Sequence, residues 1–218
     1  MLFTRRKYIM HFDIGELSNK APFVLIQNLY TEEEISQIMA ELDYLQTRKN
    51  LWVGPEKSGS AKDKDTEELL KNNSCIWLNH VYKNNDASAI LTSNMKLYSS
   101  GLAKQLAESH YIFEYLIHNS EFTTLLSYYE DSNRYKPHRD QSVLTTLTWF
   151  YKEPKKFEGG DFILNSEATI DCVNNLMLII PSTVMHEVTP VVLPSEYQNQ
   201  GFGRYTVTTF VTVKASRG

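Results

Sequence analysis

The chain has 218 residues and a formal net charge of −4 at pH 7. This length suits one domain, and 42% hydrophobic and 12% aromatic residues are enough for a packed core, which excludes global disorder. The acidic balance disfavours nucleic acid as a partner, because general nucleic-acid binders carry a basic surface that contacts phosphates.

Two features predict a reducing compartment and no membrane partner. Cys75 and Cys172 are the only cysteines, too few for a disulfide scaffold and without CxxC spacing. A basic stretch at residues 5–7 leads to polar and charged residues at 11–16 instead of an apolar segment, so neither a signal peptide nor a transmembrane helix is predicted. We therefore expect a cytoplasmic protein; the sequence predicts no oligomeric state.

The first elements predict a helical support on the N-terminal side. Residues 23–27 are apolar and form a candidate strand. Thr31 is a suitable helix N-cap, followed by three glutamates in the first turn, where the helix dipole favours acids. Apolar residues at 35, 38, 39, 42 and 45 recur at helical spacing, so one face of this helix should pack on a core.

Residues 53–74 differ from their surroundings in composition. The segment is rich in Gly, Ser, Lys and Asp and lacks hydrophobic periodicity, which indicates a loop. Two interpretations stay open: a tolerated surface insertion, or a lid that closes over a site. Beyond it, alternation predicts a strand at 75–82 that contains His80 as a hydrogen-bonded sheet histidine. Residues 93–119 then predict a helix, with a break near 109–110.

Eight short strands follow one another closely from residue 125 onwards. Turn residues separate them, and a polar excursion at 194–201 precedes the last one. Such spacing argues for a closed or double-sheet antiparallel architecture. The segments are 125–130, 135–140, 143–151, 161–164, 168–173, 176–180, 185–192 and 203–213.

The second of these strands ends in His-x-Asp. If it is extended, His138 and Asp140 point to the same face, because side chains alternate along a strand. One imidazole and one carboxylate make two-thirds of the facial triad of non-haem Fe(II) oxygenases, and His186 is the strongest candidate for the third ligand. Arg204 leads the last, alternating strand and would need an anionic partner if it faces inward.

These motifs together resemble the prolyl 4-hydroxylase branch of the 2-oxoglutarate/Fe(II) dioxygenases, in particular its bacterial PKHD-type members. The family pattern has a pair of tyrosines shortly before His-x-Asp, then Gly-Gly, then His-x-Val-x-Pro-Val, and a basic residue on the last strand. The resemblance covers residues 122–213. It is carried by Tyr129, Tyr135, His138, Asp140, the glycine pair at 159–160, the motif at 186–191 and Arg204.

The resemblance implies a fold and a domain organisation. The fold class is mainly β (α+β), with a double-stranded β-helix, or jelly roll, and supporting helices before it. Residues 1–218 would form a single dioxygenase domain. Within it, residues 1–121 would supply the helix-rich support and the loop at 53–74, and residues 122–214 the jelly-roll core.

The resemblance also implies the cofactors and their ligands. His138, Asp140 and His186 would bind Fe(II) and leave positions for 2-oxoglutarate and O2, with ascorbate as a candidate reductant. Arg204 would bind the distal carboxylate of 2-oxoglutarate, with Thr206 on the same face of its strand and Tyr129 beside it. By alternation, Thr146, Thr148 and Phe150 are expected to face inward on the third strand. The family often has a tyrosine where Phe150 stands, so the resemblance implies that this contact is either missing or moved to Thr148; simple barrel packing is the alternative for these hydroxyls.

The substrate follows from resemblance alone. It implies a prolyl residue in a protein or peptide, hydroxylated with release of succinate and CO2, and Tyr135, Arg139 and Trp149 as candidate substrate contacts. Three alternatives remain: hydroxylation of a free amino acid or small metabolite, nucleobase demethylation, or a cupin-like metal-binding module without turnover. A wide groove at the metal would favour a peptide, a closed pocket a metabolite, and a basic channel nucleic acid.

Overall fold

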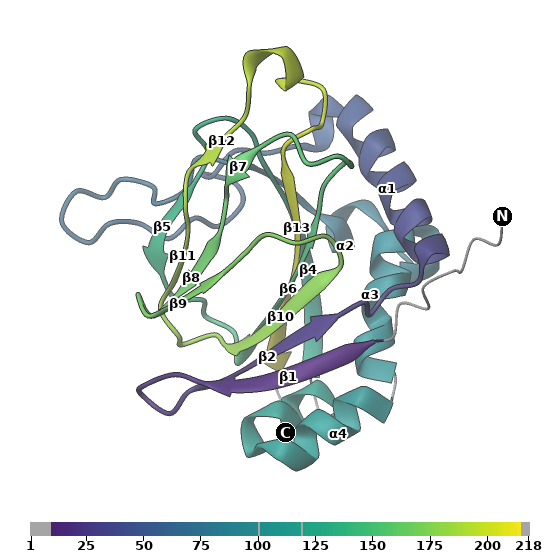
Figure 1. Ribbon diagram of the computed structural model, residues 1–218, viewed down its shortest axis with the longest axis vertical. Helices are drawn as coiled ribbons and strands as arrows, with labels where there is room; N and C mark the ends of the chain where they lie inside the picture. The colour runs from purple at the N-terminus through teal and green to yellow at the C-terminus, as the bar shows by residue number, and fades with distance from the viewer. Residues whose placement is uncertain (1–9, 100, 119, 215–218) are drawn as a thin grey trace, which may run out of the picture.

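Two facing β-sheets form the core of the protein (Figure 1). The computed structural model describes residues 10–99, 101–118 and 120–214. The larger sheet has the order β1-β2-β10-β6-β13-β4-β3, the smaller one β5-β11-β8-β9, and a further pair joins β12 to β7. The predicted jelly roll is thereby confirmed. The strands are β1 His11–Glu16, β2 Pro22–Gln27, β3 Ser74–Trp77, β4 Ser120–Tyr129, β5 Tyr135–His138, β6 Leu144–Phe150, β7 Glu158–Gly159, β8 Phe162–Leu164, β9 Ala168–Ile170, β10 Leu176–Pro181, β11 His186–Val188, β12 Val191–Val192 and β13 Arg204–Val213.

The larger sheet is buried on both faces, and alternation divides its side chains between two cores. One core lies between the sheet and the helices and includes Leu126, Phe150 and Tyr205. The other fills the space between the two sheets and includes Leu147 and Trp149. Because β4, β6 and β13 run side by side at the centre of this sheet, every second residue on them faces the interior of the jelly roll.

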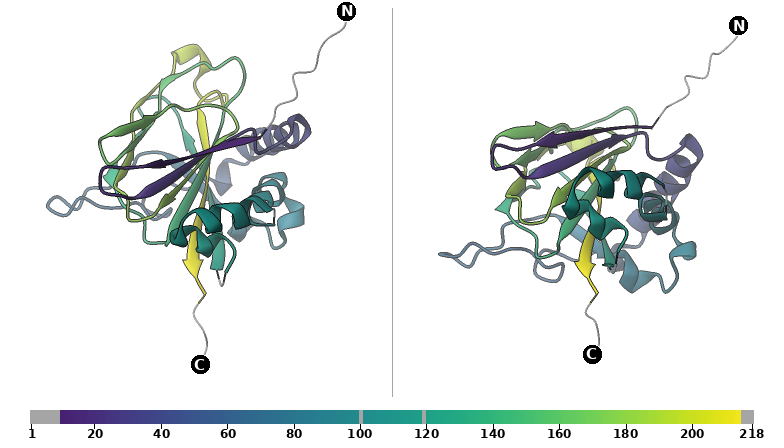
Figure 2. Two further views of the ribbon diagram at one scale, coloured as in Figure 1. Left: turned by 60° about the horizontal axis from the view of Figure 1, so that its bottom comes forward. Right: turned by 90° about the horizontal axis from the view of Figure 1, so that it is seen from below.

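The helices cover the outer face of the larger sheet (Figures 1 and 2). The helix predicted after Thr31 is α1, Glu32–Thr47. Thr31 and Glu34 form a capping box, in which the Glu34 backbone N–H donates to Thr31 Oγ1 and the Thr31 N–H donates to Glu34 Oε2. The remaining helical segments are α2 Leu78–Val81, α3 Ala89–Ser99, α4 Gly101–Ser109 and the short 3₁₀ turns η1 Lys49–Leu51, η2 Asn85–Ala87, η3 Tyr111–Leu116 and η4 Ser195–Tyr197.

The structure corrects the elements expected around residue 80. The strand predicted at 75–82 ends at Trp77, and the chain turns into α2. His80 is therefore an exposed helix residue and not a sheet histidine. Four alternating positions, three of them apolar, were too few to separate a strand from a strand followed by one helical turn. The turn is stabilised by Asn79, whose Oδ1 accepts a hydrogen bond from the backbone N–H of Thr124.

Two further differences concern the ends of the sheet and the long helix. The helix predicted at 93–119 is divided into α3, α4 and η3. Its expected break near 109–110 is confirmed, and His110 caps η3 by accepting a hydrogen bond from the backbone N–H of Ile112.

The edge strand β1 was not predicted, because polar side chains on its exposed face hid the alternation; it pairs with β2 along its whole length.

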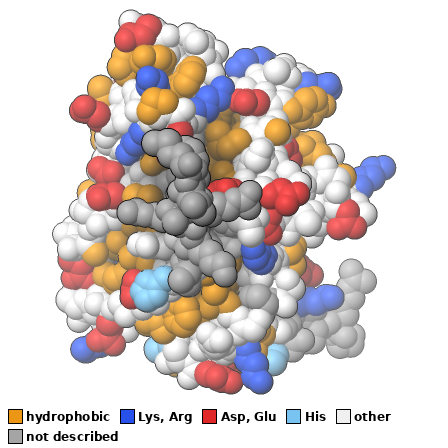
Figure 3. All heavy atoms as spheres, turned by 45° about the vertical axis from the view of Figure 1, so that its right-hand side comes forward, with side chains coloured by type: hydrophobic (Ala, Val, Ile, Leu, Met, Phe, Trp, Pro, Cys, Tyr) orange, Lys and Arg blue, Asp and Glu red, His pale blue; other side chains and the backbone are white. Residues whose placement is uncertain are grey.

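The loop at 53–74 extends from the jelly roll on the side of β5 (Figure 1). Lys62 and Leu69 form an antiparallel bridge in its projecting part, and Lys71 bridges to Tyr135 at its base. Among the described residues on the face shown in Figure 3, Lys and Arg side chains are interspersed with Asp and Glu and do not gather into a basic patch. None of the helices among the described residues is long and apolar enough to cross a membrane.

Candidate metal centre and ligand pocket

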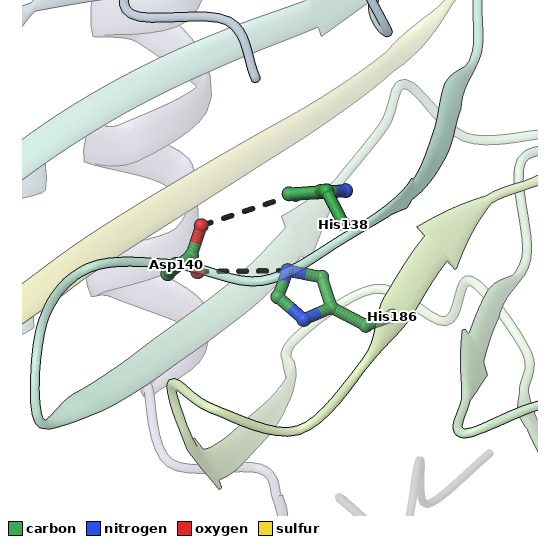
Figure 4. Close-up of side chains that lie close together, drawn as sticks. All are labelled: His138, Asp140 and His186. Carbon is green, nitrogen blue, oxygen red and sulfur yellow. Dashed lines mark ion pairs between the residues drawn. The ribbon is translucent and has the colours of Figure 1, made fainter. Parts of the chain in front are cut away.

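His138, Asp140 and His186 converge at one mouth of the jelly roll (Figure 4). His138 ends β5, His186 begins β11, and the two residues are paired directly across the smaller sheet. Asp140 lies just beyond β5, where its backbone N–H donates to the Ser182 carbonyl at 2.9 Å. The Asp140 carboxylate oxygens lie 3.9 Å from His138 Nε2 and 3.5 Å from His186 Nε2. Three ligand atoms at this spacing, all within 4.8 Å of one another, could hold one metal ion.

Both imidazoles are oriented for metal binding by their other nitrogen. Nδ1 of His138 lies 2.9 Å from the Lys136 carbonyl, and Nδ1 of His186 lies 2.9 Å from the Val184 carbonyl. A carbonyl can only accept, so each Nδ1 carries the proton and each Nε2 keeps its lone pair for a metal. Burial, with His186 nearby, lowers the pKa of His138 to about 3, so this ring is neutral at physiological pH.

The Asp140 carboxylate is held by a chain of hydroxyl groups. Thr145 Oγ1 donates to Asp140 Oδ2 at 2.7 Å. Behind it, Ser182 Oγ lies 2.9 Å from Thr145 Oγ1 and 2.6 Å from Ser142 Oγ. Hydrogen bonds to a ligating carboxylate fix its orientation, so this chain prepares Asp140 for a metal before one binds.

Arg204 lies on β13 in the interior of the jelly roll and is fully buried. Its Nη1 donates to Thr206 Oγ1 at 2.7 Å, and its guanidinium carbon lies 4.9 Å from the centre of the Tyr129 ring. Nε and Nη2 have no hydrogen-bond partner among the described residues, and no carboxylate of those residues forms an ion pair with Arg204. A buried guanidinium with free donors needs an anion, which supports the predicted carboxylate partner.

Gly160 provides the space that Arg204 occupies. Its φ is +68°, a conformation that favours glycine, and a Cβ there would lie 2.8 Å from Arg204 Cδ and 3.0 Å from Val191 Cγ2. The neighbouring Gly159 also has a positive φ, of +67°. The glycine pair is therefore required by backbone conformation and by the close approach of the arginine side chain.

The metal ligands and Arg204 line a single cavity, which we call the inner pocket. Tyr129, Ser127 and Thr206 lie between them on β4 and β13. A second, wider hollow opens to solvent beside it, and Asp140 and Tyr135 line both; we call this the outer groove. Other residues that line the outer groove are Gly59, Ser60, Ala61, Trp77, Thr123, Arg139, Gln141, Ser142, Phe210 and Thr212.

Residues of the 53–74 loop reach both cavities. Ser58 and Lys71 are 1% and 5% exposed and line the inner pocket. The Tyr135 ring stacks on the His138 ring at 3.4 Å between centres, and its hydroxyl accepts a hydrogen bond of 3.0 Å from the Ala61 N–H. Burial raises the pKa of Tyr135 to about 12, so this hydroxyl stays protonated. The base of the loop is thus anchored against a metal ligand.

The side chains of β6 point to the opposite faces from those predicted, and this changes the positions of two predicted site residues. Thr146 Oγ1 lies 3.2 Å from the hydroxyl of Tyr98 on α3, so Thr146 and, two residues on, Thr148 face the helices. Thr148 therefore cannot contact a ligand in the inner pocket. Trp149 does face inward, but it is fully buried, packs against Phe162 and does not line the outer groove, so its predicted substrate contact is also wrong.

Arg139 is at the surface, as alternation from His138 predicted. It lines the outer groove, and its Nε donates to the Thr183 carbonyl at 2.9 Å. Tyr135, Tyr129 and Thr206 also lie where they were expected, on the cavity walls.

Three residues of the site were missed by sequence reasoning. Thr145 was one threonine among several on an apolar strand, and only its distance to Asp140 identifies it. Lys71 belongs to a polar loop, where a lysine ordinarily indicates solvent exposure. Gly160 was recognised only as part of a motif, although a glycine pair before a strand is a signal of positive φ.

The comparisons with known proteins agree with this geometry. Residues 124–212 match the family model described as the 2OG-Fe(II) oxygenase superfamily, where 2OG is 2-oxoglutarate. No curated protein sequence matches the chain.

Several solved structures share the fold. The prolyl-4-hydroxylase of Pseudomonas putida is 12% identical, with a TM-score of 0.57, and the match covers 88% of this chain and 93% of that one. The viral collagen prolyl hydroxylase of Paramecium Bursaria Chlorella virus-1, solved with 2OG, is 12% identical, with a TM-score of 0.54 and coverages of 88% and 96%. An oxidoreductase of the 2OG-Fe(II) oxygenase family from Burkholderia pseudomallei is 11% identical, with a TM-score of 0.54 and coverages of 87% and 84%. At these identities the similarity establishes the fold.

Proposed function

We propose that this chain, whose jelly-roll core at residues 124–212 belongs to the 2OG-Fe(II) oxygenase superfamily, is a dioxygenase that hydroxylates a prolyl residue in a protein or peptide. Members of this superfamily use Fe(II), 2-oxoglutarate and O2. The observation that carries the proposal is the presence, in one pocket, of a His-Asp-His cluster and a buried arginine for which the described part of the chain offers no anionic partner.

The donor set fits Fe(II). His138 and His186 offer neutral imidazole nitrogens and Asp140 offers a carboxylate oxygen, which is the two-histidine, one-carboxylate set of non-haem iron sites. The hydrogen bonds at both Nδ1 atoms and at Asp140 Oδ2 already hold the three ligands in position. These residues would bind the metal on one side and leave the side toward the pocket open.

The pocket interior fits 2-oxoglutarate. Arg204 has two unused donor atoms at the end of the inner pocket away from the surface, and Thr206 and Tyr129 lie beside it. Burial raises the pKa of Tyr129, so its hydroxyl is a donor. A carboxylate placed here would satisfy the guanidinium and offset the cost of burying it, and the metal ligands that line the same pocket would hold the metal for the rest of the molecule.

When bound, Fe(II), 2-oxoglutarate and O2 supply the oxidation, which yields succinate, CO2 and a hydroxylated substrate. The chain's own residues bind and orient the reactants. Arg204 and Thr206 fix the distal carboxylate, and the buried interior around Leu147 and Phe162 keeps water away from the reacting centre. Tyr135 and Arg139, on the walls of the outer groove, are the proposed substrate contacts.

The outer groove supports a peptide as the substrate. It is open to solvent, passes Asp140, and is bordered by the 53–74 loop, so an extended chain could lie across the metal site. We propose that this loop is a lid that closes over the bound peptide. Two of the structurally similar proteins are named prolyl hydroxylases, which is the source of the preference for proline.

Succinate formation tests the enzyme class. The iron-loaded protein, incubated with 2-oxoglutarate and O2, should release succinate, and Asp140→Ala should abolish it. The matched control is Asp171→Ala, which removes an exposed carboxylate elsewhere. Full metal occupancy without succinate would instead favour a metal-binding module without turnover.

A peptide library tests the substrate. Proline-rich peptides that gain one oxygen in mass, in a reaction that consumes an equal amount of 2-oxoglutarate, would support prolyl hydroxylation. Coupled oxidation of free amino acids with no oxidised peptide would contradict the peptide proposal and leave the dioxygenase proposal intact.

A further inference from the structure

Lys71 is a buried lysine in the inner pocket that has no role in the site described so far. Its side chain is 5% exposed. Nζ donates to the Ser58 carbonyl at 3.3 Å, lies 3.8 Å from Cys75 Sγ and lies 5.5 Å from the centre of the Tyr135 ring. No carboxylate of the described residues forms an ion pair with it.

These contacts do not neutralise the positive charge of the Lys71 ammonium group. Burying a cation is costly unless an anion pairs with it, and a carbonyl, a thiol and a ring face are neutral partners. A second polar group nearby is also unused: Ser58 is 1% exposed, and its Oγ has no hydrogen-bond partner among the described residues. Both side chains line the inner pocket, where a ligand can reach them.

We propose that Lys71 and Ser58 form a second carboxylate-binding subsite in the inner pocket, separate from Arg204 and Thr206. The bridge between Lys71 and Tyr135, whose ring stacks on His138, places this subsite beside the metal ligands. The carboxylate has two possible sources, which rest on the proposed function: the metal-proximal carboxylate of 2-oxoglutarate, or a carboxylate on the substrate.

A structural role for Lys71 predicts something different. If the lysine served only to tie the loop at 53–74 to β3, replacing it would loosen the loop and lower the melting temperature. A lysine that binds a ligand, in contrast, has its charge buried without an anion in the ligand-free protein, and this lowers the stability of the fold. Lys71→Met keeps most of the side-chain volume and removes the charge, so in the metal-free protein its melting temperature should equal or exceed that of the wild type.

The first measurement needs no turnover. Metal-free protein is titrated with sodium acetate at constant ionic strength, and the melting temperature is recorded. Acetate should raise the melting temperature of the wild type, and should raise that of Lys71→Met and Ser58→Ala less. Lys62→Met is the matched control, because Lys62 lies in the same loop with its side chain 56% exposed. The result of this acetate titration does not depend on whether the chain is a dioxygenase.

The second measurement identifies the source of the carboxylate. Mn(II)-loaded protein is titrated calorimetrically without oxygen, first with 2-oxoglutarate and then with pyruvate, which lacks the distal carboxylate. If Lys71 binds the metal-proximal carboxylate, Lys71→Met weakens binding of both by the same factor, about tenfold to a hundredfold for a lost charged hydrogen bond. Arg204→Met should then weaken the binding of 2-oxoglutarate and leave the binding of pyruvate unchanged.

If the substrate supplies the carboxylate, Lys71→Met binds 2-oxoglutarate and pyruvate with the same affinities as the wild type. Stimulation of succinate release by acidic peptides or amino acids is then lost, while stimulation by neutral ones remains. The subsite is overturned if Lys71→Met matches Lys62→Met in every binding measurement, or if its only effect is a lower melting temperature. Absence of 2-oxoglutarate binding in the wild type would contradict the proposed function instead.

Discussion

The hydroxyl of Thr145 donates a 2.7 Å hydrogen bond to Oδ2 of Asp140, the carboxylate oxygen that lies 3.5 Å from Nε2 of His186. Thr145 is fully buried and is itself held by Ser182. The strand β6 thereby reaches into the metal site from the larger sheet, while all three ligands come from the smaller sheet or its edge. A ligand that is oriented before the metal arrives loses less entropy on binding it.

Replacing Thr145 by valine should therefore weaken metal binding. We expect the dissociation constant for Fe(II), or for Mn(II) as its substitute, to rise about tenfold to a hundredfold, the usual cost of losing such a supporting hydrogen bond. Thr146→Val is the matched control, because Thr146 lies next in the strand and faces the helices. Calorimetric titration checks this; equal affinities for the two variants would contradict it.

Replacing Arg204 should separate ligand binding from stability. Arg204→Met removes a buried cation that has no anionic partner among the residues that the structure describes, so the metal-free variant should be at least as stable as the wild type. Its affinity for 2-oxoglutarate should fall by about a hundredfold, and Arg204→Lys should restore part of it, since a lysine keeps the charge but not the forked geometry. Urea unfolding and calorimetry test both. An intact affinity in Arg204→Met would contradict the assignment.

Gly160→Ala should impair the same pocket by a different route. The added Cβ would meet Arg204 Cδ at 2.8 Å in a backbone conformation with φ of +68°. We expect a loss of about 1–2 kcal/mol in the free energy of unfolding from the left-handed backbone alone, together with weaker 2-oxoglutarate binding because Arg204 must move. Gly101→Ala, where a Cβ would meet nothing within 4 Å, is the control. Unfolding curves measure the free energy of unfolding of both variants, and titrations with 2-oxoglutarate measure their affinities.

Tyr135→Phe should release the base of the loop at 53–74. The variant keeps the ring that stacks on His138 and loses the acceptor for the Ala61 N–H. Trypsin should then cleave within the loop several times faster, because opening exposes its lysines, while the metal affinity changes little. The fragments can be followed by mass spectrometry, with Tyr44→Phe, at an exposed tyrosine, as the control. Unchanged cleavage would show that other contacts hold the loop.

The stability of the metal-free protein should depend on pH through His138. Its pKa is lowered to about 3 in the folded chain, mainly by burial, whereas an unfolded histidine titrates near 6.5. Below about pH 6.5 the unfolded chain binds a proton that the folded chain does not, so stability falls as the pH falls toward 3.

The slope due to this one group approaches about 1.4 kcal/mol per pH unit. Urea unfolding at pH 7.5, 6.5 and 5.5 measures it, and His138→Gln should reduce the slope by that amount. The same slope in the variant would assign the pH dependence to other groups.

Motif and alternation predicted much of this protein because both are local. The short strands and the turns between them appear directly in the sequence, and His138, Asp140 and His186 belong to motifs of the family that the chain resembles. Arg204 was identified by its place at the start of the last strand, although it lies further from His186 than the basic residue of much of that family does. Alternation misassigned Thr148, because β6 is buried on both faces and its sequence, LTTLTWF, does not alternate between polar and apolar residues in a way that reveals which side faces the pocket.

The sequence by itself determined the class of fold, the three candidate metal ligands and an inward arginine near the last strand. Only the tertiary structure decided which groups meet: Thr145 with Asp140, Gly160 with Arg204, and Lys71 with the inner pocket. Gly160 and Arg204 are tens of residues apart, Lys71 lies on a loop without a pattern, and Thr145, although only five residues from Asp140, reaches it across the bend between β5 and β6. Their contacts depend on how two sheets and a loop pack, and packing distances do not follow from spacing along a chain.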